Sequence, residues 1–598
     1  MHNNKVSQAI ETIAANMDAK NAIIVAWSGG KDSSTVLNLV FEAALFLQAQ
    51  NKPVSRIIVT HADTYIENPA VELQSTIDVR AMRRWAEEHG LDLSIKVSKP
   101  NLNELWPVRV IGGRDLPVFS GVGSDRKCTV EFKIKPQERL VRQLVKDIKQ
   151  DGGVPITVTG TRFAESASRA GRMNDRGEVA DELWLSNSGE ARLSPIADWS
   201  DEDVWKYLHA CAAGLHPSYT DFSGIIRLYR DGSDPAEIQT LPDGTEVFAC
   251  RFGCALCTAG KDKSMAWMLK NDPDRYGYMA GLHSMQKYLV NSQHDLALRQ
   301  WLNFSVSDDG YAALRPNTYS PSMLEDLLRM CLSLDVRERR AARAAGSALR
   351  FQIITAEALI AIDAVWSLQG HHEAHHAMRI YKEVLSGKLM DIPTVEPVAK
   401  TPVPSPRYVF VGMEWQDPKW RNAGLWDSTL AHFCEESGCM GSRTLSNGLE
   451  IMDVNQGPEL SIDPEAAHCF FEFELDRILG ENDSSRWRTS AYFYYARMGT
   501  ITLAKGPHLV KVDHILKRTM WKQEKGLLGL DWRKAPEKIQ ALLDASISKK
   551  ELDTLRAERL PAPGRESAPT FHEPVQPIPS TPKSVLKLVQ GCLFDFAA

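Results

Sequence analysis

The stretch "IIVAWSGGKDSST", residues 23–35, joins two kinds of local pattern. Residues 22–27 are apolar and partly β-branched up to a Ser-Gly-Gly turn, which predicts a short buried strand. From Ser33 onward, apolar residues recur at helical spacing. A strand that turns directly into a helix aims backbone N–H groups and the positive end of the helix dipole at one point, where an anion can bind. Gly29 and Gly30 suit such a turn because glycine lets a phosphate approach the backbone closely.

The residues around this turn separate it from the common phosphate-binding loop. The Walker A pattern needs a glycine five residues before its Gly-Lys pair, and Val25 occupies that position. Asp32 would place a like charge beside bound phosphates unless a metal ion accompanies them. A bare Ser-Gly-Gly turn also fits an ordinary strand-to-helix connection, so the rest of the chain decides between the two interpretations.

Further segments extend the strand–helix alternation. The second strand ends at Asp63-Thr64, before a helical pattern, and Ser200 is a candidate N-cap with acidic residues in the first turn after it. Alternating strands and helices predict right-handed crossovers and a parallel sheet that binds its ligand at the carboxyl ends of the strands. The segments that carry this pattern are 56–72, 93–100, 154–169 and 193–208.

Several of these motifs resemble one enzyme superfamily. "SGGKDS", residues 28–33, resembles the PP-loop of the ATP pyrophosphatases, which cleave ATP between the α- and β-phosphates. The strand end Asp63-Thr64 and the motif Gly160-x-Arg162-x-x-Glu165-Ser166 are similar to elements of the phosphoadenosine phosphosulfate (PAPS) reductases. The resemblance implies that ATP is bound by Ser28, Gly29, Gly30, Lys31, Asp32, Ser33, Ser34, Asp63, Thr64, Gly160, Arg162 and Ser166.

The same resemblance implies catalytic roles for four of the charged residues. Backbone N–H groups of the loop would hold the departing pyrophosphate, and Lys31 would compensate its charge. Asp32 would act through Mg²⁺ or fix the loop. Arg162 would clamp phosphate, and Glu165 would orient phosphate or hold metal.

Cysteine spacing indicates a second kind of chemistry. Cys250, Cys254 and Cys257 form a C-x3-C-x2-C cluster, whose thiols must converge on one ion or cluster or be redox-active. Cys128 is the candidate fourth ligand, because its segment resembles the region of adenylylsulfate reductases that carries their upstream cluster cysteines. Four thiolates suit a [4Fe–4S] cluster or structural zinc, and we expect the iron–sulfur cluster. A metal-free cluster of thiols stays open.

The segment "RFGCALCT…KDKSM" narrows the resemblance to the DNA phosphorothioation sulfurtransferases of Dnd type and Ssp type, over roughly residues 20–300. That family implies cleavage of ATP to AMP and pyrophosphate to activate a DNA phosphate, as part of a bacterial DNA-modification and antiphage-defence system. A cysteine desulfurase would then deliver the sulfur, with other subunits of the complex as partners. The sequence leaves the choice between the two types open.

Composition sets outer limits on function. The 598 residues are 43% hydrophobic and carry a net charge of −6, which argues against a uniformly basic nucleic-acid coat while leaving room for a local basic groove. We expect two or three domains and a cytoplasmic protein without membrane contact, because no signal pattern and no apolar run of spanning length occur in the sequence.

The predicted fold class is α/β: a PP-loop parallel sheet with helices on both faces, then a helical region and a separate C-terminal α+β domain. The expected divisions are a PP-loop domain (1–260), a helical region (261–392), a Pro-rich linker (393–407), an α+β domain (408–559), a Pro-rich tether (560–583) and an apolar tail (584–598).

Three other functions compete with DNA phosphorothioation: a PAPS or adenylylsulfate reductase, a PP-loop enzyme that thiolates RNA, and a non-catalytic DNA-binding scaffold. The reductases use a C-terminal Glu-Cys-Gly segment, whereas Cys592 stands between Gly591 and Leu593. The intact "SGGKDS" argues against a scaffold. Cys592 itself is either a sulfur carrier on the tether or one apolar contact of a docking tail.

Overall fold

The computed structural model describes residues 2–117, 127–186, 189–258, 263–400, 402–425, 442–444, 450–452, 454–480, 487–505 and 507–559. The chain divides into two compact units, Met1–Ser548 and Lys549–Ala598. The described part of the second unit is the helix α22 (Lys549–Arg559). The tether and the apolar tail with Cys592 lie outside the described residues. The domain boundaries expected within the first unit stay predictions.

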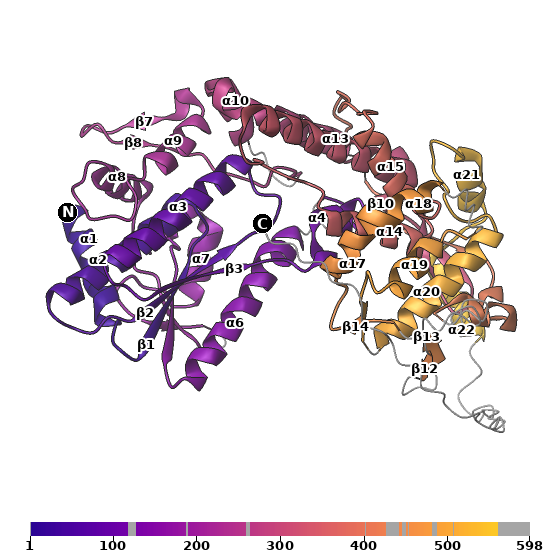
Figure 1. The fold of residues 1–598 in the computed structure, drawn as a ribbon, viewed down its shortest axis with the longest axis horizontal. Coiled ribbons are helices and arrows are strands. Elements are labelled where there is room, and N and C mark those ends of the chain that lie inside the picture. Colours follow the sequence, from indigo (N-terminus) through magenta and orange to yellow (C-terminus); the bar gives the residue numbers. More distant parts are fainter. Residues whose placement is uncertain are drawn as a thin grey trace. The chain divides into compact units, whose positions relative to one another are not determined.

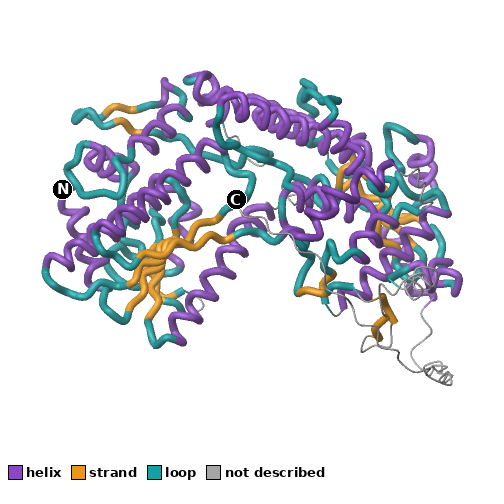
Figure 2. Tube along the Cα trace, in the orientation of Figure 1, coloured by secondary structure: helices purple, strands orange, loops and turns teal. Residues whose placement is uncertain are grey.

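The first unit is built on a six-stranded sheet (Figures 1 and 2). Its strand order is β3-β2-β1-β4-β6-β5, and every neighbouring pair is parallel except β5 with β6. The predicted parallel α/β sheet is therefore confirmed. The strands are β1 (Asn21–Ala26), β2 (Arg56–Ala62), β3 (Leu93–Ser98), β4 (Val154–Val158), β5 (Trp184–Leu185) and β6 (Ala191–Leu193).

The central strand β1 is apolar on both faces because helices cover both sides of the sheet. Ile23 and Val25 belong to one core cluster, whereas Ile24 belongs to another that includes Val145 and Ile148 of α6. In Figure 1, α6 lies on one side of the strands and α2 and α3 on the other. The helices of this part are α1 (His2–Ala15), α2 (Lys31–Ala49), α3 (Pro69–Glu88), α4 (Trp106–Val110), α5 (Lys127–Thr129), α6 (Lys135–Gln150), α7 (Ala167–Asp175), α8 (Asp201–Ala212) and α9 (Ser223–Asp231).

The rest of the unit is mostly helical, as expected for 261–392, and it adds a four-stranded antiparallel sheet of order β16-β11-β10-β9. This sheet is formed by β9 (Arg299–Val306), β10 (Tyr311–Tyr319), β11 (Arg407–Phe410) and β16 (Ile547–Ser548). The Pro-rich segment before β11 thus leads directly into a strand that pairs with β10. Smaller pairs are β7 (Gln239–Thr240) with β8 (Glu246–Val247), β12 (Ser442–Thr444) with β13 (Glu450–Met452), and β14 (Gln456–Gly457) with β15 (Leu503–Ala504).

The helices of this region are α10 (Ser264–Asn271), α11 (Pro273–Tyr276), α12 (Ala280–Ser292), α13 (Pro321–Ala345), α14 (Ala356–Gln369), α15 (His376–Leu385), α17 (Pro464–Cys469), α18 (Leu475–Gly480), α19 (Ser490–Arg497), α20 (Pro507–Glu524) and α21 (Pro536–Asp544). Among all described residues, no helix combines the length and the hydropathy needed to span a bilayer.

One buried carboxyl makes the stability of the first unit depend on pH. Asp78 of α3 is fully buried, and Gln74 Nε2 donates to its Oδ1 at 2.8 Å. Burial raises the pKa of Asp78 to about 7. The folded protein therefore keeps a proton that the unfolded chain releases above its ordinary pKa, so this group lowers stability as pH rises toward 7.

We expect Asp78→Asn to remove this pH dependence. Relative to wild type, the variant should gain roughly 2–3 kcal/mol more at pH 8 than at pH 5, as each pKa unit is worth about 1.4 kcal/mol. Urea unfolding at both pH values measures the difference. Asp147→Asn is the matched control, because Gln143 donates to Asp147 in the same i,i+4 geometry on the exposed face of α6. Equal pH profiles for wild type and Asp78→Asn would contradict the assignment.

Candidate active site

The glycine-rich turn lies at the carboxyl end of β1 and opens helix α2, as the sequence predicts. Gly29 has a φ of +74°, and Gly30 is the N-cap of α2 without a side-chain cap. Ser33 Oγ accepts a hydrogen bond from Ser28 N at 3.1 Å and donates to Gly30 O at 3.1 Å, which closes the turn. The N-terminus of a 19-residue helix therefore lies at the end of the central strand, which is the geometry that favours a bound anion.

The charged residues of the turn form a closed network with Arg162 and Asp201. Arg162 Nε donates to Asp32 Oδ1 at 2.7 Å, and its Nη2 donates to Asp201 Oδ1 at 2.7 Å. Lys31 Nζ lies 3.0 Å from Asp32 Oδ1 and 2.8 Å from Asp201 Oδ1. Two cations thus face two anions, and the four charges balance within the network.

Arg162 is the buried centre of this network. Its side chain is 1% exposed, and Nη1 donates to Trp199 O at 3.2 Å. Burial alone would lower the pKa of Arg162, but the Asp32 and Asp201 carboxylates raise it. In this structure the guanidinium holds the turn against the first residue of α8. Its expected role as a phosphate clamp stays a prediction.

Gly160 explains how the loop after β4 packs against the turn. A Cβ built on Gly160 would lie 2.8 Å from Asp32 O, closer than real Cβ atoms come to other atoms, and 3.1 Å from Ser33 N, which is a tight contact. Any side chain here would push the turn away from β4. This close approach is the structural reason for the glycine in the Gly160-x-Arg162 motif.

The remaining predicted nucleotide residues stand near this turn in well-defined local structures. Ser166 is the N-cap of α7, accepting from Arg169 N at 3.2 Å, and Glu165 Oε1 accepts from Arg162 N at 3.3 Å. At the end of β2, Asp63 Oδ1 accepts from Tyr65 N at 2.9 Å. Further buried hydroxyls are Thr64 Oγ1, which donates to Glu67 at 3.1 Å, and Ser34 Oγ, which accepts from the Trp27 indole at 3.0 Å. The ligand contacts expected for these residues stay predictions.

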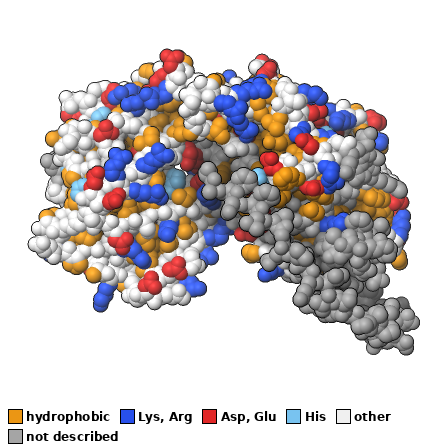
Figure 3. Space-filling model, in the orientation of Figure 1, with side chains coloured by type: hydrophobic (Ala, Val, Ile, Leu, Met, Phe, Trp, Pro, Cys, Tyr) orange, Lys and Arg blue, Asp and Glu red, His pale blue; other side chains and the backbone are white. Residues whose placement is uncertain are grey.

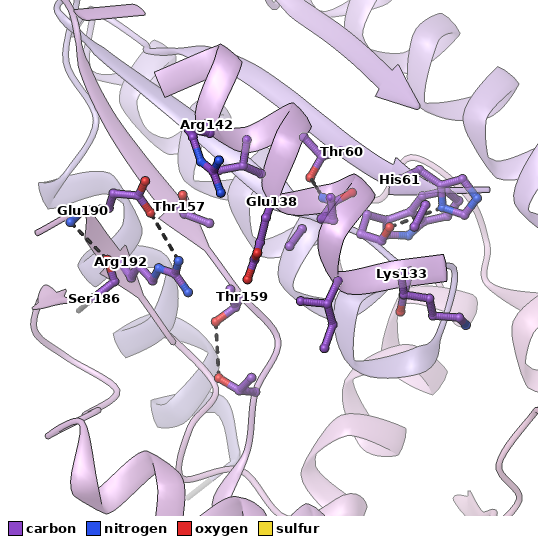
Figure 4. Close-up of a pocket in the computed structure, with 18 of the residues that line it drawn as sticks. Thr60, His61, Lys133, Glu138, Arg142, Thr157, Thr159, Ser186, Glu190 and Arg192 are labelled. Atoms are coloured by element: carbon purple, nitrogen blue, oxygen red, sulfur yellow. Dashed lines mark hydrogen bonds and ion pairs between the residues drawn. The ribbon is translucent and has the colours of Figure 1, made fainter. Parts of the chain in front are cut away.

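A pocket of about 1040 Å³ opens beside the turn, at the carboxyl ends of β1, β2 and β4. Ser28 belongs to its lining, and α6 forms one wall (Figure 4). The lining also contains Trp184, and the guanidinium groups of Arg176 and Arg192 lie 5.5 and 5.6 Å from the centroid of its ring. Buried Glu178 accepts from Ser194 Oγ at 3.1 Å and from Arg176 Nε at 2.7 Å. Because Arg176 and Arg192 are also paired with Glu178 and Glu190, this part of the lining combines an aromatic ring with paired charges.

His61 is a polar residue of the pocket that sequence patterns did not single out. Its Nδ1 lies 3.3 Å from Trp27 O, and within the described residues its buried Nε2 has no hydrogen-bond partner. Burial lowers the pKa of His61, which favours the neutral imidazole. With Nδ1 donating to the carbonyl, Nε2 is an acceptor on the pocket lining. In the sequence, His61 is marked only by its position two residues before Asp63-Thr64, near the end of the second strand.

Three of the four predicted metal-ligating cysteines share one environment. Cys257 N donates to Cys254 O at 3.0 Å, and the charge of Cys257 adds to burial in raising the pKa of Cys128. Burial also raises the pKa of Cys254, where Lys133 is a nearby cation. Lys133 lies in η2 (Val130–Ile134), a π-helical turn between α5 and α6, and lines the pocket. These thiols therefore border the candidate nucleotide site.

Cys250 lies against the C-terminal end of helix α9. A Cβ on Gly232, at the end of α9, would approach Cys250 Sγ to 2.9 Å, and Cys250 packs with the core cluster of the first sheet. The side chains of Cys128, Cys254 and Cys257 are half-buried, and a bound metal ion would stabilise their thiolates. A metal centre held by Cys128, Cys250, Cys254 and Cys257 stays a prediction.

The Gly160 contact gives a direct test of how the site is assembled. Gly160→Ala should lower the free energy of unfolding by about 1–3 kcal/mol, because the added methyl group meets backbone atoms that cannot rotate away. Gly171→Ala is the matched control: nothing lies within 4 Å of a Cβ at Gly171 in α7, so alanine should be neutral or stabilise by up to about 1 kcal/mol. Urea unfolding compares the two. Equal effects of both substitutions would show that the close approach is absent.

Comparison with known proteins agrees with this geometry. A family model described as the phosphoadenosine phosphosulfate reductase domain matches residues 22–259. The phosphoadenosine 5'-phosphosulfate reductase of Xanthomonas axonopodis pv. citri is 33% identical over 129 residues, which is 21% of this chain and 44% of that protein. The corresponding protein of Xanthomonas oryzae pv. oryzae is 32% identical over the same shares. The chain thus spans less than half the length of these relatives.

Two solved structures are similar at lower identity. The U34-tRNA thiolase NcsA from Methanococcus maripaludis, with its [4Fe-4S] cluster, aligns with a TM-score of 0.23 and 15% identity, covering 35% of this chain and 64% of that chain. The FMN adenylyltransferase of Candida glabrata, in complex with FMN and an ATP analog, aligns with a TM-score of 0.22 and 15% identity, covering 40% and 67%. By the family match and the parallel sheet, residues 22–259 are similar to the phosphoadenosine phosphosulfate reductase domains of the PP-loop superfamily.

Proposed function

We propose that this protein cleaves ATP to AMP and pyrophosphate and thereby activates a DNA backbone phosphate for replacement of a non-bridging oxygen by sulfur. The observation that carries the first part is the turn of Ser28–Ser33: it presents the N-terminus of α2 beside a pocket large enough for a nucleotide. Similarity to PAPS reductase domains supports chemistry on an adenine nucleotide with sulfur.

Different residues of the site would bind different parts of ATP. Backbone N–H groups of the turn would hold the departing pyrophosphate, and Lys31 would compensate its charge. His61 Nε2 is an acceptor that the adenine amino group can satisfy. Trp184 offers an aromatic surface to the rest of the nucleotide, and Arg176 and Arg192 would add hydrogen-bond donors beside it.

Mg²⁺, when bound with ATP, would neutralise phosphate charge. The Asp32 carboxylate fits the role of a metal ligand poorly in this structure. Lys31 Nζ lies 3.0 and 3.1 Å from its two oxygens, and Arg162 also donates to Oδ1. These contacts favour the second role expected for Asp32, which is to fix the loop.

The proposed reaction has three steps: adenylylation of the DNA phosphate, displacement of AMP by sulfur, and cleavage of the sulfur–sulfur bond. A non-bridging oxygen of the DNA phosphodiester attacks the α-phosphorus of ATP, pyrophosphate leaves, and the DNA phosphate becomes adenylylated. The terminal sulfur of a persulfide, supplied by a cysteine desulfurase partner, attacks the DNA phosphorus, and AMP leaves with the original oxygen. A second thiol then cleaves the sulfur–sulfur bond, which leaves a disulfide and the phosphorothioate.

DNA would contact a limited basic surface of the protein. On the face shown in Figure 3, lysine and arginine side chains are interspersed with acidic ones, in keeping with the net charge of −6. One candidate surface is the C-terminal part of α13, where Arg337, Arg340 and Arg343 are exposed. Arginines at this spacing on one helix can follow a phosphate backbone.

A sulfonucleotide reductase is the second candidate, because the matching family model and the curated relatives carry that name. Such an enzyme would bind a sulfonucleotide in the same pocket and reduce it without cleaving ATP. The two functions therefore differ in their products from labelled ATP.

Labelled ATP separates these functions. We expect α-labelled ATP to yield AMP, with pyrophosphate released in equal amount, and DNA to stimulate turnover. Asp32→Ala should reduce turnover at least a hundredfold, since it leaves buried Arg162 with one carboxylate partner. Lys206→Ala, which removes only the surface pair to Asp243, should retain wild-type turnover. ADP and phosphate as products would refute the PP-loop assignment, and sulfite release from a sulfonucleotide without ATP cleavage would establish the reductase instead.

A further inference from the structure

A cluster of histidines lies outside the site described above. The segment "HHEAHH", residues 371–376, joins α14 to α15, and none of its members was singled out from the sequence. The structure brings two of these histidines, His372 and His376, together with Glu325 from the second turn of α13. One ligand atom from each of these three residues lies within 4.8 Å of the others.

The geometry of this group resembles a coordination sphere. His376 Nε2 lies 3.4 Å from Glu325 Oε2, and the rings of His372 and His376 are stacked with centroids 4.6 Å apart. A tetrahedral site with metal–ligand distances of about 2.1 Å has ligand–ligand edges of about 3.4 Å. Glu325 is held from its other oxygen, because Arg329 Nη2 lies 3.5 Å from Oε1. Oε2 can therefore contact a metal while Oε1 keeps its protein partner.

Burial makes the arrangement costly without a ligand. His372 is 8% exposed, and within the described residues its Nε2 has no hydrogen-bond partner. A buried polar atom without a hydrogen-bond partner destabilises the folded state. Neighbouring structure fixes the group in place: Trp366 packs on the His372 ring at 4.4 Å, and Ala377 N donates to Asp363 Oδ1 at 3.0 Å in the first turn of α15.

We infer that Glu325, His372 and His376 bind a divalent transition-metal ion, with Zn²⁺ as the best match. Two imidazole nitrogens and one carboxylate are an established Zn²⁺ donor set, with the fourth position left to water or another ligand. The ion would satisfy the buried Nε2 of His372 and connect α13 to the start of α15. This site is separate from the cysteines and does not depend on the proposed reaction with ATP.

Metal binding by the full-length protein tests the inference. Metal-depleted protein is titrated with Zn²⁺ against a chromophoric chelator, in the Cys254→Ser background so that the cysteine site contributes less. Glu325→Gln should bind one equivalent fewer than its parent. Glu373→Gln is the matched control, because Glu373 lies in the same segment with its side chain 80% exposed, and it should bind as the parent does. Equal stoichiometry for the parent and Glu325→Gln would overturn the inference.

X-ray absorption of the Zn²⁺-loaded Cys254→Ser protein decides the matter even if Glu325→Gln fails to fold. A shell of nitrogen and oxygen ligands at about 2.0–2.2 Å supports the site. A shell of sulfur alone, or no bound zinc, refutes it.

Discussion

The ion pairs of Arg162 are the constraint on which the candidate active site depends. The Arg162 guanidinium is 1% exposed, and a buried charge without a partner is strongly destabilising. Asp32 and Asp201 supply the two partners from the start of α2 and the start of α8. The turn, the loop after β4 and helix α8 are therefore fixed to one another before any ligand arrives, and Gly160 makes the required close approach possible.

The pocket and the cysteines meet at one segment. Lys133 of η2 forms an ion pair with Glu67 at 2.5 Å, both residues line the pocket, and both act on the charge of Cys254. A change in the charge of the thiols, by metal binding or oxidation, would therefore change the electrostatic potential at Lys133 and Glu67, which line the candidate nucleotide site. This proximity supports a function in which sulfur or redox chemistry and nucleotide chemistry occur side by side.

The sequence predicted what local patterns encode and missed what long-range contacts create. The strand–turn–helix around Gly29 and Gly30 could be predicted because its signals lie within a few residues. Asp201 could be predicted only as a first-turn helix residue, because its partners Lys31 and Arg162 are distant in the chain and meet it only in the folded sheet. His61 and the wall of Trp184 were missed for the same reason. Glu325 and His376 have no spacing signal, because they lie far apart in the chain and meet only where α13 packs against the start of α15.

The fate of the DNA phosphate oxygen distinguishes adenylylation of DNA from hydrolysis of ATP by water. DNA with ¹⁸O in its non-bridging phosphate positions is incubated with the protein, ATP and a persulfide donor, and the AMP formed is examined by mass spectrometry. Adenylylation of DNA followed by displacement with sulfur transfers one DNA oxygen to each AMP, so we expect singly ¹⁸O-labelled AMP. AMP that carries oxygen from solvent water and none from DNA would contradict this expectation.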